Sequence, residues 1–100
     1  MPDGHELDVA RRAKMIEGLK TELVGEMAQI YRGFWEGNQQ EIIDGLAGLI
    51  LRSYLLARKI GVSYWELDDA IKEKLRTQLQ HHRPSGDGFG DLSSLERHLD

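Results

Sequence analysis

The chain has 100 residues, including 13 lysines and arginines and 17 acidic residues, a net charge of −4 and no cysteine. This length suits one domain with a modest core, and without cysteine there are no disulfides. The most apolar stretch, 42–60, contains Asp44 and three basic residues, whereas a membrane span needs about 20 mostly apolar residues. The basic residues are scattered, and the N-terminus lacks an apolar signal core. We therefore expect a cytoplasmic protein with neither a nucleic-acid nor a membrane partner.

The first predicted element is a helix from about Glu6 to Glu36. Apolar side chains recur there at steps of three and four residues, which is the period of one helix face. Gly37 and Asn38 follow, and both residue types tolerate the left-handed conformation that ends helices. The stripe consists of Ile16, Leu19, Leu23, Met27 or Ile30, and Phe34.

Two more helices are predicted after this turn. The second, from about Gln39 to Ile60, is apolar on nearly every side, so it belongs in the middle of an assembly, and Gly61 is its natural end. Ser63 and Glu66 form a capping-box pattern, which predicts a third helix running to about His82.

The remaining residues, 84–100, are predicted to be a flexible linker and C-terminal tail. The stretch 83–90 is rich in glycine and contains Pro84, which is typical of a linker. Ser93 and Glu96 form a second capping-box pattern, which predicts one or two helical turns or a disordered tail.

The predicted fold is thus all-α, an antiparallel bundle of three main helices over residues 1–83. Three helices leave one side of the apolar central helix uncovered. A second copy of the chain would cover it, so we expect a homo-oligomer, either a dimer or a tetramer.

Two acidic pairs are the candidate functional residues. Glu22 and Glu26 are four residues apart on the first helix, and Glu41 and Asp44 are three apart on the second, so each pair shares a helix face. Asp44 has apolar neighbours in sequence, and a buried carboxylate requires a partner. A divalent cation is one such partner, and Mg²⁺ favours oxygen ligands. Spacing alone favours the simpler alternative, in which these acids are solvated or stabilise a helix N-terminus.

The order and spacing of these acids resemble the MazG-like branch of the all-α nucleotide pyrophosphohydrolases. The resemblance covers about two-thirds of the chain, from Lys14 to about Leu79. The family pattern is E-E-x-x-E, a variable spacer and E-x-x-D. The matching segments are Leu19–Glu26, Glu41–Asp44 and Tyr54–Ser63.

This resemblance implies an Mg²⁺-dependent enzyme that hydrolyses a nucleoside triphosphate to monophosphate and pyrophosphate. Glu22, Glu26, Glu41 and Asp44 then correspond to the metal ligands, with Mn²⁺ as an alternative ion, and Glu22 and Glu26 are the candidate catalytic residues. The chain departs from the pattern at Leu23, which replaces a glutamate and cannot bind metal, so we expect weakened catalysis.

Basic residues near these acids are candidates for binding the substrate's phosphates, chiefly Lys20 and Arg52. Two interpretations remain open. Glu26, Glu41 and Asp44 favour an enzyme, to which the sequence leans, whereas Leu23 favours a non-catalytic module for oligomerisation or nucleotide binding.

Overall fold

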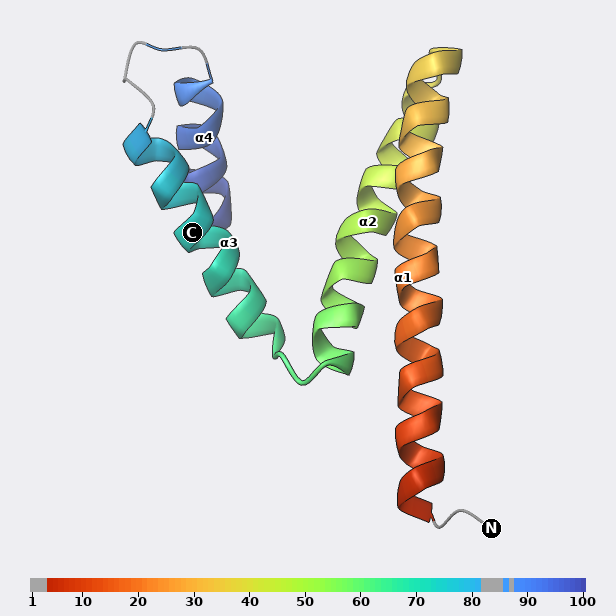
Figure 1. The fold of residues 1–100 in the computed structure, drawn as a ribbon. Helices are drawn as coiled ribbons and strands as arrows, with labels where there is room; N and C mark the ends of the chain where they lie inside the picture. Colours follow the sequence, from red (N-terminus) through yellow and green to blue (C-terminus); the bar gives the residue numbers. More distant parts are fainter. Residues whose placement is uncertain (1–3, 82–85, 87) are drawn as a thin grey trace. The chain divides into compact units, whose positions relative to one another are not determined.

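The computed structural model describes residues 4–81, 86 and 88–100. These residues form four helices and no strand, so the predicted all-α class is confirmed (Figure 1). They fall into two compact units, Met1–Ser63 and Tyr64–Asp100. The helices are α1 (Gly4–Glu36), α2 (Gln39–Lys59), α3 (Tyr64–His81) and α4 (Phe89–Leu99).

A two-residue turn joins α1 to α2. Gly37 has a φ of 66°, the left-handed conformation that glycine adopts without steric cost, so the predicted end of the first helix is confirmed. Asn38 is extended instead, with a φ of −101°. Its side-chain oxygen accepts a hydrogen bond from the Glu41 backbone N–H at 3.1 Å, and it therefore begins α2 as the N-cap.

Glycines allow α1 and α2 to approach closely as they run antiparallel (Figure 1). Gly33 on α1 and Gly45 on α2 are both buried. A Cβ at Gly33 would meet Ile42, and one at Gly45 would meet Ile30. In each of these contacts the glycine and the isoleucine are equally far from the turn at 37–38. The contacts therefore fix the register of the antiparallel pair.

The end of α2 and the start of α3 follow the prediction closely. Helix α2 ends at Lys59, and Gly61 has a φ of 88°. The Val62 backbone N–H donates to the Ala57 carbonyl at 2.9 Å, which satisfies one of the carbonyls that a helix C-terminus leaves unpaired. Helix α3 then begins directly after Ser63.

The C-terminal helix α4 is longer than the one or two turns predicted, with 11 residues. The second capping-box pattern does not start it, because the helix begins at Phe89, four residues before Ser93. Ser93 instead accepts a hydrogen bond through its hydroxyl oxygen from Arg97 at 3.0 Å. The predicted linker lies partly outside the described residues, at 83–85 and 87.

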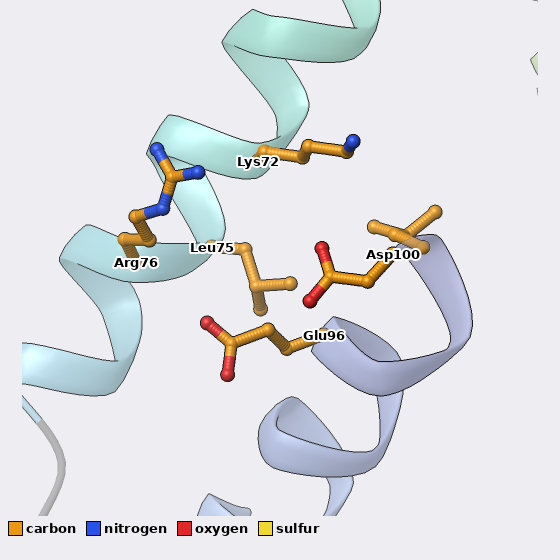
Figure 2. A pocket seen from close by; sticks show the side chains of 6 residues that line it. Lys72, Leu75, Arg76, Glu96 and Asp100 are labelled. Atoms are coloured by element: carbon orange, nitrogen blue, oxygen red, sulfur yellow. The ribbon is translucent and has the colours of Figure 1, made fainter.

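Helix α4 is ordered by packing against α3. Leu75 of α3 is only 6% exposed, and it lines a small cavity of about 50 Å³ between the two helices (Figure 2). The other lining residues are Lys72 and Arg76 of α3, Glu96 and Leu99 of α4, and Asp100, which follows α4. They place basic groups of α3 opposite two carboxylates. Tertiary packing of this kind stabilises a helix in the tail.

The α1–α2 pair leaves many large apolar side chains exposed. Trp35 is 91% exposed and Ile50 is 60% exposed. The exposed set also includes Val24, Tyr31, Phe34, Ile43, Leu46 and Leu51. Among the described residues, none of the helices has both the length and the apolar character required to cross a bilayer.

Candidate metal and phosphate site

The first acidic pair converges on one cation from the neighbouring helix. Glu22 and Glu26 lie one turn apart on α1, and Arg52 of α2 lies opposite them. Arg52 Nε is 3.2 Å from Glu22 Oε2, and its Nη1 is 3.4 Å from Glu26 Oε1. The side chains of Glu26 and Arg52 are 16% and 28% exposed, whereas that of Glu22 is 53% exposed. The cluster is therefore half-buried and open on the Glu22 side.

Gly48 makes room for the more buried of these carboxylates. A Cβ at this position would overlap the Glu26 carboxylate, so the absence of a side chain lets the Glu26 carboxylate lie against the backbone of α2. This glycine therefore provides space for an acidic side chain of the candidate site.

The second acidic pair lies elsewhere and has other partners. Glu41, in the first turn of α2, forms an ion pair with Arg32 Nε at 3.1 Å. The Glu41 side chain is 19% exposed. Asp44 is exposed, and its Oδ1 accepts a hydrogen bond from Gln40 Nε2 at 2.9 Å. The expectation that Asp44 is buried among its apolar neighbours is therefore wrong, because its side chain projects from the exposed face of α2.

The two pairs do not form one cluster in this structure. Asp44 precedes Arg52 by eight residues, about 12 Å along the helix axis at 1.5 Å per residue. Among the described residues, no three histidine or acidic side chains come close enough together to hold a metal ion. The structure thus brings Glu22 and Glu26 together, and it places Glu41 and Asp44 near the α1–α2 turn.

Two other residues singled out in the sequence flank the first pair. Lys20 forms an ion pair with Glu17 on α1 at 2.8 Å, and both side chains are more than half exposed. Leu23, at the position where the resemblance leads us to expect a glutamate, is half-buried. Consecutive helix residues point about 100° apart, so Leu23 faces a different direction from Glu22, which contacts Arg52.

Two convergent carboxylates are enough to take part in binding Mg²⁺. This ion keeps several waters and is commonly held by one or two carboxylates together with substrate phosphates. Glu22 and Glu26 already direct oxygen atoms at one positively charged group. Their donor chemistry therefore fits Mg²⁺ when the remaining ligands come from water and from a phosphorylated substrate.

The described residues form an all-α protein with two glutamates that face one arginine across a helix pair. The model of the MazG-like family matches residues 9–92, and the chain belongs to this family. The comparisons with curated proteins and with solved structures gave no match.

Sequence reasoning named Arg52 as a phosphate ligand but missed its contact with Glu22 and Glu26. A usable signal was present, because Glu22 lies 15 residues before Gly37 and Arg52 lies 14 residues after Asn38. In an antiparallel pair joined by a short turn, residues equally far from the turn face each other. The same count places Asp44, only six residues after Asn38, away from Glu22.

Proposed function

We propose that the chain is a nucleoside triphosphate pyrophosphohydrolase that forms monophosphate and pyrophosphate in an Mg²⁺-dependent reaction. The observation that carries this proposal is the convergence of Glu22 and Glu26 on a single positively charged side chain, Arg52. Membership of the MazG-like family supports it, since the resemblance in the sequence implies this activity.

In the proposed site, Glu22 and Glu26 hold the ion jointly with the triphosphate. When bound, the ion supplies charge neutralisation at the phosphates and lowers the pKa of a bound water. Glu22 is the more exposed carboxylate, so it is the better placed to accept a proton from the attacking water. Glu26 is held against Gly48 and fixes the position of the site. Arg52 and Lys20 are the nearby cations proposed to contact phosphate oxygens.

The proposed site has fewer acids than the family pattern. Leu23 replaces one acid, and Glu41 and Asp44 are engaged near the turn. Two carboxylates give weaker binding of the free metal than four, so the metal should bind mainly as its complex with the triphosphate. We therefore propose low catalytic activity and weak binding of Mg²⁺ or Mn²⁺ alone.

Pyrophosphate release from a panel of nucleoside triphosphates, with Mg²⁺ or Mn²⁺, tests this function. The wild-type chain should release pyrophosphate, and Glu22→Gln should reduce the rate by about 100-fold or more, as expected for loss of a general base. Glu36→Gln is the matched control, because Glu36 is an exposed glutamate at the other end of the same helix. Equal rates for Glu22→Gln and Glu36→Gln would remove the catalytic assignment.

The exposed apolar surface of α1 and α2 supports a second proposal, that the chain assembles as a homo-oligomer. Fully burying one large apolar side chain stabilises a protein by about 1.5–3 kcal/mol. Trp35, Phe34 and Ile50 are each at least 60% exposed, so association could recover a large part of this energy. Sedimentation should show a dimer or tetramer at micromolar concentration, whereas a well-folded monomer would contradict the assembly.

If assembly is observed and no triphosphate is hydrolysed, the non-catalytic alternative replaces the enzyme. The apolar surface is the observation that favours this second candidate, since it serves an assembly module whether or not the acids bind metal.

A further inference from the structure

We propose that Arg52 is an internal cation that competes with divalent metal for Glu22 and Glu26, and that it transfers to the substrate's phosphates when metal and triphosphate bind together. This inference rests on the proposed function and adds a positioning role for Arg52. It makes the metal site dependent on substrate, because metal alone must displace the arginine without offering it another partner.

The contacts of Arg52 with the two glutamates are long enough for another cation to replace it. Its Nε atom is buried and makes no hydrogen bond, although it lies 3.2 Å from Glu22 Oε2. Charge-assisted N–H···O contacts of good geometry are typically about 2.7–2.9 Å, shorter than the contacts of Arg52 with either glutamate. The guanidinium is thus held by two long ion pairs, and it has further donors that phosphate oxygens can use.

The charges explain why metal and arginine exclude each other. Two carboxylates carry two negative charges, and Arg52 neutralises one of them. A divalent cation placed between the same oxygen atoms would lie beside a positive guanidinium in a half-buried setting, where like charges repel more strongly than in water. With Arg52 displaced, the ion neutralises both carboxylates, and the freed guanidinium can pair with the negatively charged triphosphate.

This exchange predicts coupling between the two ligands. Triphosphate should raise the affinity for metal because it provides Arg52 with an alternative partner, and metal should raise the affinity for triphosphate by the same factor. A purely structural ion pair between α1 and α2 produces no coupling through Arg52.

The test is calorimetric titration of Mg²⁺ into the full chain, with and without an α,β-imido nucleoside triphosphate. Arg52→Gln removes the competing charge, so without nucleotide it should bind Mg²⁺ about tenfold more tightly than wild type, the size expected when two partly exposed ion pairs are lost. The imido triphosphate should raise the Mg²⁺ affinity of the wild type and have a much smaller effect on Arg52→Gln. Arg52→Lys keeps the charge and should resemble wild type without nucleotide.

The matched control is Arg32→Gln, because Arg32 forms the other ion pair between α1 and α2, with Glu41. It should leave Mg²⁺ affinity unchanged. The proposal is overturned if Arg52→Gln binds Mg²⁺ like wild type, if Arg52→Lys binds as tightly as Arg52→Gln, or if Arg32→Gln has the larger effect. Arg52→Met keeps the apolar stem of the side chain and replaces Arg52→Gln if that variant does not fold.

The same variants separate this inference from the proposed hydrolase function. Tight Mg²⁺ binding by Arg52→Gln without pyrophosphate release by any variant supports the competition and rejects the hydrolase. Pyrophosphate release by the wild type with unchanged Mg²⁺ affinity in Arg52→Gln rejects the competition and keeps the hydrolase. If no variant binds Mg²⁺ with or without nucleotide, both are rejected.

Discussion

The two acidic pairs look alike in the sequence but have different surroundings in the structure. Glu22 and Glu26 lie in the middle of α1 and face Arg52 across the helix pair. Glu41 and Asp44 lie at the start of α2, where Glu41 pairs with Arg32 and Asp44 is exposed. Helical spacing is thus the same kind of evidence for both pairs, and distance from the turn decides which pair can share a cation with the opposite helix.

The comparison also separates two uses of acidic residues. An acid in the first turn of a helix is stabilised by the helix dipole, which accounts for Glu41 without any ligand. An acid in the middle of a helix has no such benefit, so the half-buried Glu26 depends on the opposite helix for its counter-charge. The mid-helix pair is therefore the better candidate for a ligand site.

The largest effect on the melting temperature with ligand should come from neutralising one acidic pair at a time. Glu22→Gln/Glu26→Gln should abolish the rise in melting temperature that Mg²⁺ with imido triphosphate gives the wild type, because both proposed ligands lose their charge. Glu41→Gln/Asp44→Asn should keep most of that rise. Differential scanning fluorimetry measures both, and the reverse result would place the site at the start of α2.

A smaller effect is expected from substituting Gly45, whose close contact with α1 sets the register of α2 against α1. This register decides which residues the two acidic pairs face. Alanine favours helix by up to about 1 kcal/mol over glycine, but here its Cβ would meet the Ile30 backbone nitrogen at 3.2 Å and the Glu26 carbonyl oxygen at 3.1 Å. Because backbone cannot yield as a flexible side chain does, Gly45→Ala should lower the free energy of unfolding by about 1–3 kcal/mol.

Urea denaturation of Gly45→Ala measures this change. The control is Gly48→Ala, where the three atoms nearest to the added Cβ all belong to the end of the flexible Glu26 side chain. It should cost less stability than Gly45→Ala and weaken Mg²⁺ binding instead. Equal stability losses would show that the two glycines have the same packing role.

Adding an acid at position 23 should increase the difference in metal binding between the two acidic pairs. Leu23→Glu restores the acid of the family pattern, so it should tighten Mg²⁺ binding and increase triphosphate hydrolysis. It should also lower the stability of the metal-free protein by about 1–2 kcal/mol, since it replaces a half-buried leucine with a charge. Calorimetry and thermal melts measure the two changes, and an intact variant with unchanged metal binding would count against the site on α1.

The smallest effect is expected at Asp44. Its carboxylate is exposed and accepts one hydrogen bond, from Gln40, so Asp44→Asn should change the free energy of unfolding by less than about 0.5 kcal/mol. Thermal melts with and without Mg²⁺ should match those of the wild type. A loss of Mg²⁺ stabilisation in this variant would show that Asp44 is a metal ligand after all.

The sequence by itself determined the helices and their ends, because these depend on local chemistry. Apolar residues at helical spacing predicted α1, α2 and α3, and glycines that adopt positive φ at 37 and 61 marked their limits. Local patterns were insufficient for α4, since its helix depends on covering Leu75 of α3. The capping-box letters at Ser93 and Glu96 therefore predicted a helix start at the wrong residue.

Only the tertiary structure decided which acids meet which cations. Candidate ligands could be chosen from residue type and spacing, but an ion pair between helices depends on register, which glycines at 33 and 45 set through close backbone contact. That register places Arg52 opposite Glu22 and Glu26, and it leaves Asp44 exposed. Charge interactions fall off with distance, so a helix offset of about 12 Å is enough to turn one predicted four-acid cluster into two separate pairs.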